Sequence, residues 1–446
     1  MLFMKIEIDF QERLGKVKPM HAVNNGPRSG GSSLSKDASE YFKNANIPFV
    51  RLHDTEGAYG SNQYVDVHCI FPDFSADPEN AESYNFLPTD RYLKAIKDCG
   101  AEVFYRLGES IDHYEKKLYV HPPKDYLKWA KICEHIILHY NYGWADGFHY
   151  DIQYWEIWNE PDNKRMWTGT HREFFELYRV AANYLKEKFP SLKIGGYAAS
   201  GFYVNNRTNP SEWFKTLVPY MYEFFDYITA ENTKAPMDFF SWHCYAETPE
   251  EVALHARYAD ELLKKYGLTH CESILDEYNT FDSLGVFPKL HSEYASEVAA
   301  TMINAQNSPL DMLMYYDMRF NYMNGVLQLI DYTNIVSLPA YRSFEFYGRL
   351  YRLGTQVALQ SEGAYALAAS GEGSNAVMIS TFGGGGTLKV RWRGNVYGKA
   401  VITEVIGDGT VKETERFVKE EDELLLETQK NCVYMIDFFD ERIKMK

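Results

Sequence analysis

The sequence predicts a (β/α)₈ (TIM) barrel followed by a C-terminal antiparallel β-sandwich. Between about residues 20 and 350, strand-like apolar runs alternate with amphipathic helical stretches, which is typical of a parallel α/β barrel. After residue 353 short alternating strands are separated by glycines and acidic residues, as in a sandwich. A doubly wound sheet is the alternative, but the first strand-to-helix turn lacks the GxGxxG pattern of that fold.

The barrel elements follow one another in regular order. Eight strands are expected, at Met20–Asn24, Phe49–His53, Glu102–Leu107, Gln153–Trp158, Lys193–Tyr197, Phe239–Cys244, Ser273–Glu277 and Met312–Tyr316. Helices are clearest where apolar residues recur every three or four positions, at Tyr126–His139, Arg172–Lys188, Glu250–Lys265 and Ser292–Asn307. Eight such strand-then-helix units predict a closed barrel.

The second domain is expected to combine both ends of the chain. Its strands are predicted at Ala364–Ser370, Ala376–Phe382, Thr387–Trp392, Lys399–Val405, Glu423–Leu426 and Cys432–Phe438. The N-terminal run Lys5–Phe10 also alternates, so we expect it to pair with this sheet. Four glycines at Gly383–Gly386 predict a hairpin turn. The domains are therefore placed at 15–350 for the barrel and at 1–14 with 351–446 for the sandwich.

Composition limits the partners and the compartment. A net charge of −16 argues against nucleic acid and anionic membranes as partners. No run approaches the length of apolar residues that spans a membrane. The six cysteines have no paired spacing, and the N-terminal residues lack the pattern of an export signal, so a cytoplasmic protein with reduced thiols is the expectation. Whether the chain forms a homo-oligomer stays open.

The segment Tyr154–Asp162 carries the strongest chemical signal. A β-prone run with three aromatic residues leads into Asn159 and Glu160, and Pro161 ends the strand because proline cannot donate to a sheet. The amide and the carboxyl therefore lie at the C-terminal rim of a barrel strand, where the active sites of such barrels lie. The pair suits sugar chemistry, since the amide can bind a hydroxyl and the acid can protonate a glycosidic oxygen.

A second carboxyl follows at the end of another strand. The run Ser273–Thr280 is apolar at first and then places Asp276 and Glu277 where it turns polar, about three strand–helix units after Glu160. Strand alternation predicts that Asp276 and Glu277 face opposite sides, so only one of them can meet Glu160. Two acids facing each other across a barrel mouth hydrolyse glycosides without a metal or an organic cofactor.

These motifs carry a resemblance to a known family. The Asn-Glu-Pro segment is similar to the acid/base motif of the retaining glycoside hydrolases of clan A, and in particular to family 39, the β-xylosidase and α-iduronidase group. Asp276 to Thr280 resembles the family's nucleophile motif Thr-Glu-Phe-Asn/Ser-Thr, with Asp in place of Thr. The resemblance implies that Glu160 is the acid/base and selects Glu277 as the nucleophile.

The resemblance also suggests supporting residues on neighbouring strands. His53 resembles the family's His after Ile-Arg-Phe and would contact sugar hydroxyls. The run Asp238–Tyr245 resembles Asp-Phe-x-Ser-x-His-x-Tyr, in which His243 would line the sugar site and Tyr245 would donate to the nucleophile. For His243 the alternative is a buried structural histidine.

Three further candidates rest on residue type and position. Arg51 ends the second strand and either holds Glu277 ionised or spans the barrel interior as a structural residue. Trp167 and Trp242 are candidates for stacking on sugar faces, with the hydrophobic core as the alternative for each.

The expected function is a retaining, exo-acting glycoside hydrolase, with a β-xyloside as the leading substrate. An endo-acting glycanase, a glycosidase for arabinose-containing or other plant glycans, and a non-catalytic sugar-binding barrel are the alternatives. Tyr315 and Tyr316 end the last strand where clan members often have tryptophan, so the sugar specificity is the weakest part of the resemblance. We also expect burial and the charge of Glu277 to raise the pKa of Glu160.

Overall fold

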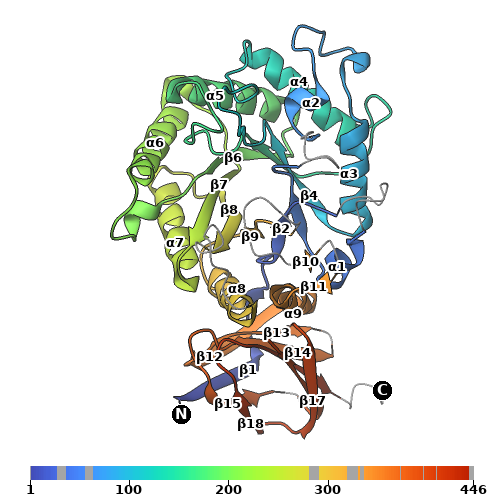
Figure 1. The fold of residues 1–446 in the computed structure, drawn as a ribbon, viewed down its shortest axis with the longest axis vertical. Coiled ribbons are helices and arrows are strands. Elements are labelled where there is room, and N and C mark those ends of the chain that lie inside the picture. The colour runs from blue at the N-terminus through green and yellow to red at the C-terminus, as the bar shows by residue number, and fades with distance from the viewer. Residues whose placement is uncertain are drawn as a thin grey trace.

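The computed structural model describes residues 2–27, 37–55, 64–280, 291–318, 330–331, 336–371, 373–394, 396–407 and 409–440. Its larger part is a closed barrel of parallel strands in the order β2 to β9 (Figure 1). These strands are β2 (Ala22–Asn24), β3 (Phe49–Arg51), β4 (Glu102–Leu107), β5 (Tyr154–Ile157), β6 (Lys193–Ala199), β7 (Phe239–Ala246), β8 (Glu272–Thr280) and β9 (Met312–Tyr315). The predicted barrel is confirmed, and each expected strand overlaps an observed one.

Helices surround the barrel strands (Figure 1). They are α1 (Ser39–Asn44), α2 (Val67–Ile70), α3 (Leu87–Asp98), α4 (Tyr126–Tyr142), α5 (His171–Lys188), α6 (Glu212–Thr229), α7 (Pro249–Lys265), α8 (His291–Gln306) and α9 (Pro339–Leu353). Local sequence explains their limits: Thr170 and Glu173 form a capping box that starts α5, and Gly143 ends α4 in the left-handed conformation. Among the described residues, no helix has the length and apolar character that crossing a membrane requires.

Short elements complete the barrel domain. Three 3₁₀ turns and one small ribbon are described: η1 (Ala81–Ser83), η2 (Tyr203–Asn205), η3 (Glu231–Thr233), and β10 (Ile330–Asp331) paired with β11 (Val336–Ser337). The turn η2 lies between β6 and α6, on the side where the barrel strands end.

The smaller part is a nine-stranded, mostly antiparallel sheet in the order β17-β16-β19-β14-β13-β12-β1-β15-β18. Its strands are β1 (Leu2–Lys16), β12 (Thr355–Glu362), β13 (Tyr365–Gly371), β14 (Ser374–Ser380), β15 (Gly386–Arg393), β16 (Gly398–Val405), β17 (Val411–Val418), β18 (Glu423–Thr428) and β19 (Val433–Asp440). The expected pairing of the N-terminal run is confirmed, because β1 lies between β12 and β15. Two strands were not predicted from the sequence: β12, and the edge strand β17, which has charged residues at most positions.

This sheet folds over on itself to form a sandwich. Phe438 of β19 packs 5.4 Å from Phe10 of β1 and 5.0 Å from Trp392 of β15, although several strands separate them in the sheet order. The prediction of a hairpin at Gly383–Gly386 is wrong, since β14 and β15 are not neighbours. Instead β15 lies between the N-terminal strand β1 and β18.

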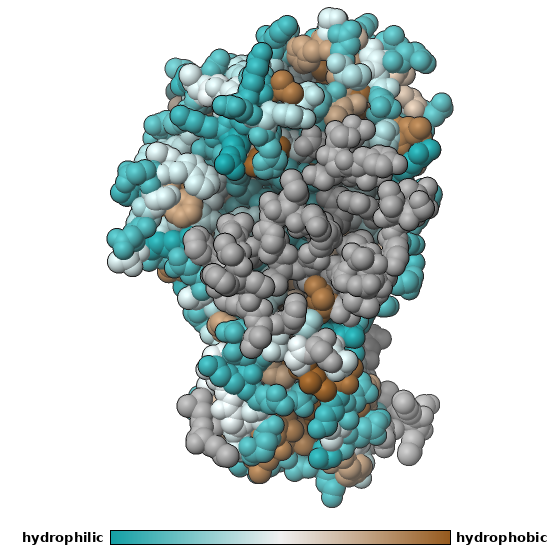
Figure 2. Space-filling model, in the orientation of Figure 1, coloured by the Kyte–Doolittle hydropathy of each residue, from teal (hydrophilic) through white to brown (hydrophobic). Residues whose placement is uncertain are grey.

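Helices α8 and α9 lie between the barrel and the sheet (Figure 1). Arg349 of α9 forms an ion pair with Asp437 of β19 at 2.8 Å, and the Ser380 hydroxyl donates to the backbone oxygen of Ser296 at 2.6 Å. In the view of Figure 2, hydrophobic side chains gather on part of the sheet domain below the barrel. The domain limits at residues 14/15 and 350/351 stay predictions.

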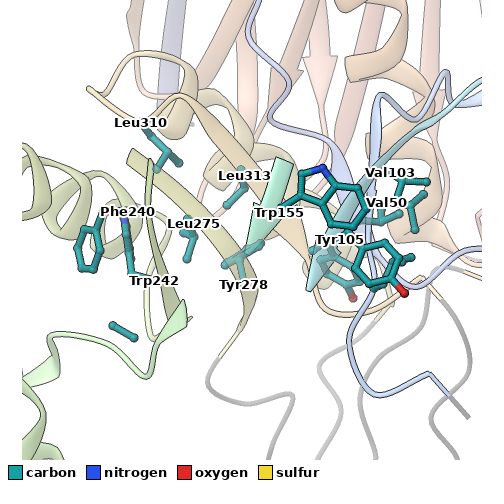
Figure 3. Close-up of a cluster of buried hydrophobic side chains, with 14 of the residues drawn as sticks. Val50, Val103, Tyr105, Trp155, Phe240, Trp242, Leu275, Tyr278, Leu310 and Leu313 are labelled. Carbon is teal, nitrogen blue, oxygen red and sulfur yellow. The ribbon is translucent and has the colours of Figure 1, made fainter. Parts of the chain in front are cut away.

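Two apolar layers hold the barrel strands in place. Outward-facing residues such as Val50, Tyr105 and Trp155 pack in the core beneath the helices (Figure 3). Inside the barrel, near the N-terminal ends of the strands, the Phe104 ring lies 5.2 Å from the rings of Tyr154 and Phe239. These aromatic side chains fill the lower interior, so the opposite end of the barrel is the one left for chemistry.

The position of β1 makes the N-terminus part of the stability of the C-terminal sheet. Ile6 is fully buried between β12 and β15, so Ile6→Ala should lower the free energy of unfolding by about 2 to 5 kcal/mol, measured by urea denaturation. Its neighbour Glu7 faces solvent, and Glu7→Ala should change the free energy of unfolding by less than about 0.5 kcal/mol. Equal effects of the two substitutions would contradict this position for β1.

Candidate active site

The interior of the barrel changes from apolar to charged within two residues along the strands. Side chains two positions apart in a strand share a face, so the residues after Phe104, Tyr154 and Ile274 in this alternation also point inward. They form a second layer that consists of Asn24, Arg51, Arg106, Glu156 and Asp276, all with no exposed surface. A fully buried polar layer therefore lies between the apolar floor and the C-terminal rim.

Arg51, the last residue of β3, is the centre of this layer. Its Nε lies 2.8 Å from Oε2 of Glu156 and 2.8 Å from Oδ2 of Asp276. Its Nη1 lies 3.4 Å from Oε2 of Glu277, and its Nη2 donates to Oδ1 of Asn159 at 2.6 Å. Burial opposes the charge, but Asp276, Glu156 and Glu277 raise the pKa of Arg51 above its usual value. Arg51 thus spans the interior and also reaches Glu277, so its two interpretations are compatible.

Asp276 and Glu277 face the same buried cluster, which corrects the expectation from strand alternation. The register of β7 and β8 pairs Trp242 with Leu275 but His243 with Glu277, so β8 contains one extra residue. Such a bulge breaks the alternation and turns consecutive side chains to one side. As a result, Nε2 of His243 lies 3.6 Å from Oδ1 of Asp276 and 3.8 Å from Oε2 of Glu277.

The acids of this cluster differ in protonation. Burial raises the pKa of Asp276 well above its usual range, and the charge of Glu156 adds to this effect. Burial also acts on Glu156, but the charge of Arg51 outweighs it and lowers the pKa of that carboxyl. We therefore expect a neutral Asp276 beside an ionised Glu156. No sequence pattern selected Glu156, which precedes the conspicuous Asn-Glu pair.

Glu160 enters the cluster from a tight turn at the end of β5. Trp158 and Glu160 both adopt positive φ angles, 72° and 42°, and the Glu160 amide donates to the backbone oxygen of Ala198 at 3.0 Å. Nδ1 of His243 lies 2.8 Å from Oε1 of Glu160. One oxygen of Glu160, one oxygen of Glu277 and a ring nitrogen of His243 all lie within 4.8 Å of one another. The structure thus brings the two sequence-predicted acids together.

The proton of this group resides on the histidine. Burial raises the pKa of Glu160, but the hydrogen bond and charge of His243, with a hydrogen bond from Asn163, lower it overall. Burial opposes protonation of His243, yet the charge of Glu277 and the contact with Glu160 raise its pKa to about 9. The expectation of a raised pKa for Glu160 is therefore wrong, because it left out the cation that β7 places beside the acid.

Tyr245 connects the cluster to a buried ion pair behind it. Its phenol donates to Oε1 of Glu277 at 2.7 Å, while its backbone amide donates to the Tyr203 hydroxyl at 2.9 Å. Nη2 of Arg207 donates to the Tyr245 backbone oxygen at 2.5 Å, and Nε of Arg207 pairs with Glu251 at 3.1 Å. Both backbone groups of Tyr245 are thereby fixed, which orients the phenol toward Glu277.

His53 lies at the rim with two residues that the sequence did not select. Burial lowers the pKa of His53 well below its usual value, and Arg51 adds to this effect, so the ring is neutral. Nε2 of His53 lies 3.3 Å from Oδ1 of Asp54, and the Tyr316 hydroxyl donates to Oδ2 of Asp54 at 3.2 Å. Burial raises the pKa of Asp54 to about 7. In the sequence, the only feature that points to Asp54 as a site residue is its position directly after His53 at the end of a strand.

Neither of the predicted stacking tryptophans lines this cluster. Trp242 follows the alternation of β7 and faces away from His243, has no exposed surface, and donates from Nε1 to the Ser273 hydroxyl at 3.0 Å (Figure 3). Trp167 is only 3% exposed and packs edge-on against Trp158 at 5.1 Å. Both are core residues, so their assignment to sugar stacking is wrong.

Metal binding is the other chemistry to consider for such clusters. Three groups of described residues bring suitable atoms together: Glu160 with His243 and Glu277, Asp66 with His68 and Glu109, and Cys244 with Glu251 and His255. In each group an acid already binds a cationic side chain. These cations are His243, His68, whose pKa Glu109 raises to about 11 despite burial, and Arg207. A protonated imidazole has no lone pair for a metal, so the sets with His243 and His68 do not fit one, and in the third set Arg207 already pairs with Glu251.

Comparisons with known proteins identify relatives of the barrel. The family model described as glycosyl hydrolases family 39 matches residues 4–306. A beta-xylosidase of Caldicellulosiruptor saccharolyticus is 26% identical over 259 residues, 54% of this chain and 46% of the relative. A beta-xylosidase of Geobacillus stearothermophilus is 24% identical over 242 residues, 47% of this chain and 44% of the relative. The matched regions thus span about half the length of these relatives.

Solved structures resemble the whole chain. A glucosidase from Croceicoccus marinus has a TM-score of 0.80 at 21% identity, covering 98% of this chain and 99% of that one. A monomeric beta-xylosidase from Caulobacter crescentus CB15 has a TM-score of 0.72 at 15% identity, with the same coverage of 98% and 99%. At these identities the likeness shows that the fold of barrel and sheet is shared.

The contact between Glu160 and His243 predicts an unusual titration. NMR should show His243 losing its proton near pH 9, and Glu160→Gln should lower this midpoint because it removes a hydrogen-bonded anion. Because the folded-state pKa lies above the ordinary 6.5, the protonated ring stabilises the fold fully below about pH 6.5, and this contribution is lost as the pH rises through about 9.

A second buried histidine serves as the control for this titration. His255 lies behind β7, and burial lowers its pKa to about 4. Its midpoint should not respond to Glu160→Gln. A His243 midpoint below about 7 in the unsubstituted protein would contradict the assignment of the proton.

Proposed function

We propose that this chain, which belongs to glycosyl hydrolases family 39, is a retaining, exo-acting β-glycosidase with Glu160 as acid/base and Glu277 as nucleophile. The observation that carries the proposal is the approach of their carboxylate oxygens to within 4.8 Å. Retaining glycosidases have carboxyl groups about 5 to 5.5 Å apart, whereas inverting enzymes leave about 6.5 to 9.5 Å for a water molecule. The spacing therefore supports retention.

Glu277 attacks the anomeric carbon in the first step. The bond to the leaving oxygen breaks, an ester forms between Glu277 and the sugar, and the leaving oxygen takes a proton from Glu160. Tyr245 and Arg51 contact different oxygens of Glu277 and orient the carboxylate for this attack. Asp276 lies beside Glu277 but is neutral, so it adds no negative charge that would oppose the approach of an electron-rich oxygen.

The proton for the leaving group comes from the Glu160–His243 pair. At neutral pH the pair holds one proton, on Nδ1 of His243 and 2.8 Å from Oε1 of Glu160. A shift across this hydrogen bond turns Glu160 into the acid of the first step and leaves a neutral imidazole. In the second step water loses a proton to Glu160 as it attacks the ester, which restores both carboxyl groups.

The substrate class follows from the relatives rather than from the cluster. The two relatives described above are beta-xylosidases, which makes a β-xyloside the leading substrate of this chain. Asn159, His53 and Asp54 supply donors and acceptors for the hydroxyls of one sugar, next to the two acids. Screening a panel of aryl β-glycosides tests the sugar directly, and the absence of hydrolysis across the panel would contradict a glycosidase.

The two acids should differ in their response to substitution. Glu277→Ala should abolish turnover of every glycoside, because no ester can form. Glu160→Ala should retain the first step with activated aryl glycosides, because a good leaving group needs no proton, and a burst of released phenol measures this step.

Asp276 provides a matched control beside the nucleophile. Asp276→Asn mimics the neutral acid that the structure places there and should keep most of the activity, whereas Glu277→Gln should be inactive. Activity in Glu277→Gln together with inactivity in Asp276→Asn would assign the nucleophile to Asp276 instead.

Exo-action predicts the products from longer substrates. Incubation with a ladder of xylo-oligosaccharides should release single xylose units from one end, as followed by chromatography of the products over time. Early accumulation of mid-length fragments would show an endo-acting glycanase. No cleavage, combined with hydrolysis of another aryl glycoside, would exclude xylose and retain the mechanism.

A further inference from the structure

We propose that Trp213 is a stacking platform for the sugar on the leaving-group side of Glu160. The ligand is a pyranose with equatorial hydroxyls, such as the second unit of a β-linked oligosaccharide. The inference rests on the proposed function, since Glu160 defines the leaving-group side. It assigns to Trp213 the contact that Trp167 and Trp242 cannot make from the core.

Trp213 is placed by the segment that follows β6. The Ser211 hydroxyl caps the first turn of α6, and Trp213 lies in this turn. Its Nε1 lies 3.5 Å from the backbone oxygen of Asp162, two residues beyond Glu160. The connection from β6 to α6 begins at the C-terminal rim of the barrel, so the indole lies at the edge of the candidate site.

Several hydrogen bonds fix loop 160–163, which contacts Trp213 through the backbone of Asp162. Asp162 accepts hydrogen bonds from the amide of Ser200 at 3.1 Å and from its hydroxyl at 2.5 Å. Asn163 donates from Nδ2 to Oε2 of Glu160 at 2.9 Å. Loop 160–163 therefore holds the acid and the backbone contact of Trp213 in one rigid arrangement.

An aromatic wall connects Trp213 to the nucleophile's hydrogen-bond partner. The Trp213 ring lies 5.3 Å from Phe214, and the Phe214 ring lies 4.3 Å from Tyr203. The Tyr203 hydroxyl in turn accepts a hydrogen bond from the backbone amide of Tyr245. Trp213 is the outer end of this wall, which runs along the side of the site that holds Glu160.

The exposure of Trp213 sets it apart. It is the most exposed of the eight tryptophans, at 42%, although Phe214 and the Asp162 backbone hold its ring. The indole therefore presents an open aromatic surface next to the loop that holds Glu160. Axial C–H bonds of an all-equatorial pyranose carry partial positive charge, which complements the negative face of the indole. Because Glu160 protonates the leaving oxygen, the sugar bound to that oxygen must lie beside loop 160–163, within reach of this face.

The test compares two substrates that differ only beyond the cleaved bond. Xylotriose places a sugar on the leaving-group side, whereas β-xylosyl fluoride places a single fluorine atom there. Trp213→Ala should lower the ratio of kcat/KM for xylotriose to kcat/KM for xylosyl fluoride by about tenfold. Trp213→Phe, which keeps an aromatic face, should recover most of the ratio. Tyr397→Ala is the matched control, since Tyr397 is 40% exposed but lies in the sheet domain.

Each outcome decides the proposal. An equal loss with both substrates, or an unchanged ratio, overturns the platform. If the parent protein cleaves neither substrate, a β-xyloside is excluded as its substrate, and direct titration of xylotriose and cellotriose decides the platform separately. In that case at least a tenfold weaker binding by Trp213→Ala, with Tyr397→Ala like the parent, supports it, and equal binding by both variants rejects it.

Discussion

The buried guanidinium of Arg51 is the interaction on which the rest of the barrel depends. An unpaired ion in a protein interior costs several kcal/mol even after relaxation, so Arg51 is stable there only with its acids. Its partners come from other strands, with Glu156 on β5 and Asp276 and Glu277 on β8. The charge that organises the site therefore also holds together strands that are not neighbours, across the hollow upper half of the barrel.

One cation does not balance all the acids in this space, and the structure resolves the excess in two ways. Asp276 takes a proton, because burial and Glu156 together outweigh the effect of Arg51. Glu160 receives its own cation, because β7 places His243 at 2.8 Å. The protonation states of these acids thus follow from where the strands place two cations, rather than from the acids themselves.

The sequence predicted those features that depend on strand periodicity and strand ends. The apolar runs located all eight barrel strands, and Pro161 correctly placed Glu160 at the end of β5. Periodicity failed where tertiary structure changes it: the extra residue in β8 turns Glu277 inward beside Asp276. It also gave no way to tell the outward Trp242 from the inward His243 before the register of β7 was known. His243 carries its proton because it contacts Glu160, which follows a strand far away in the sequence. No local sequence pattern contains such a contact.

The bulge in β8 connects the packing of the barrel interior to the geometry of the candidate site. A regular strand would turn only one of the two consecutive acids into the barrel, leaving either Arg51 without Asp276 or His243 without Glu277. The extra residue lets Asp276 complete the polar layer around Arg51 while Glu277 stands one step nearer the rim, opposite Glu160. Bulges occur often beside active sites because they re-aim a side chain without changing the strand order. Here the redirected residue is Glu277, the proposed nucleophile. Asp276 lies beneath it in the polar layer around Arg51.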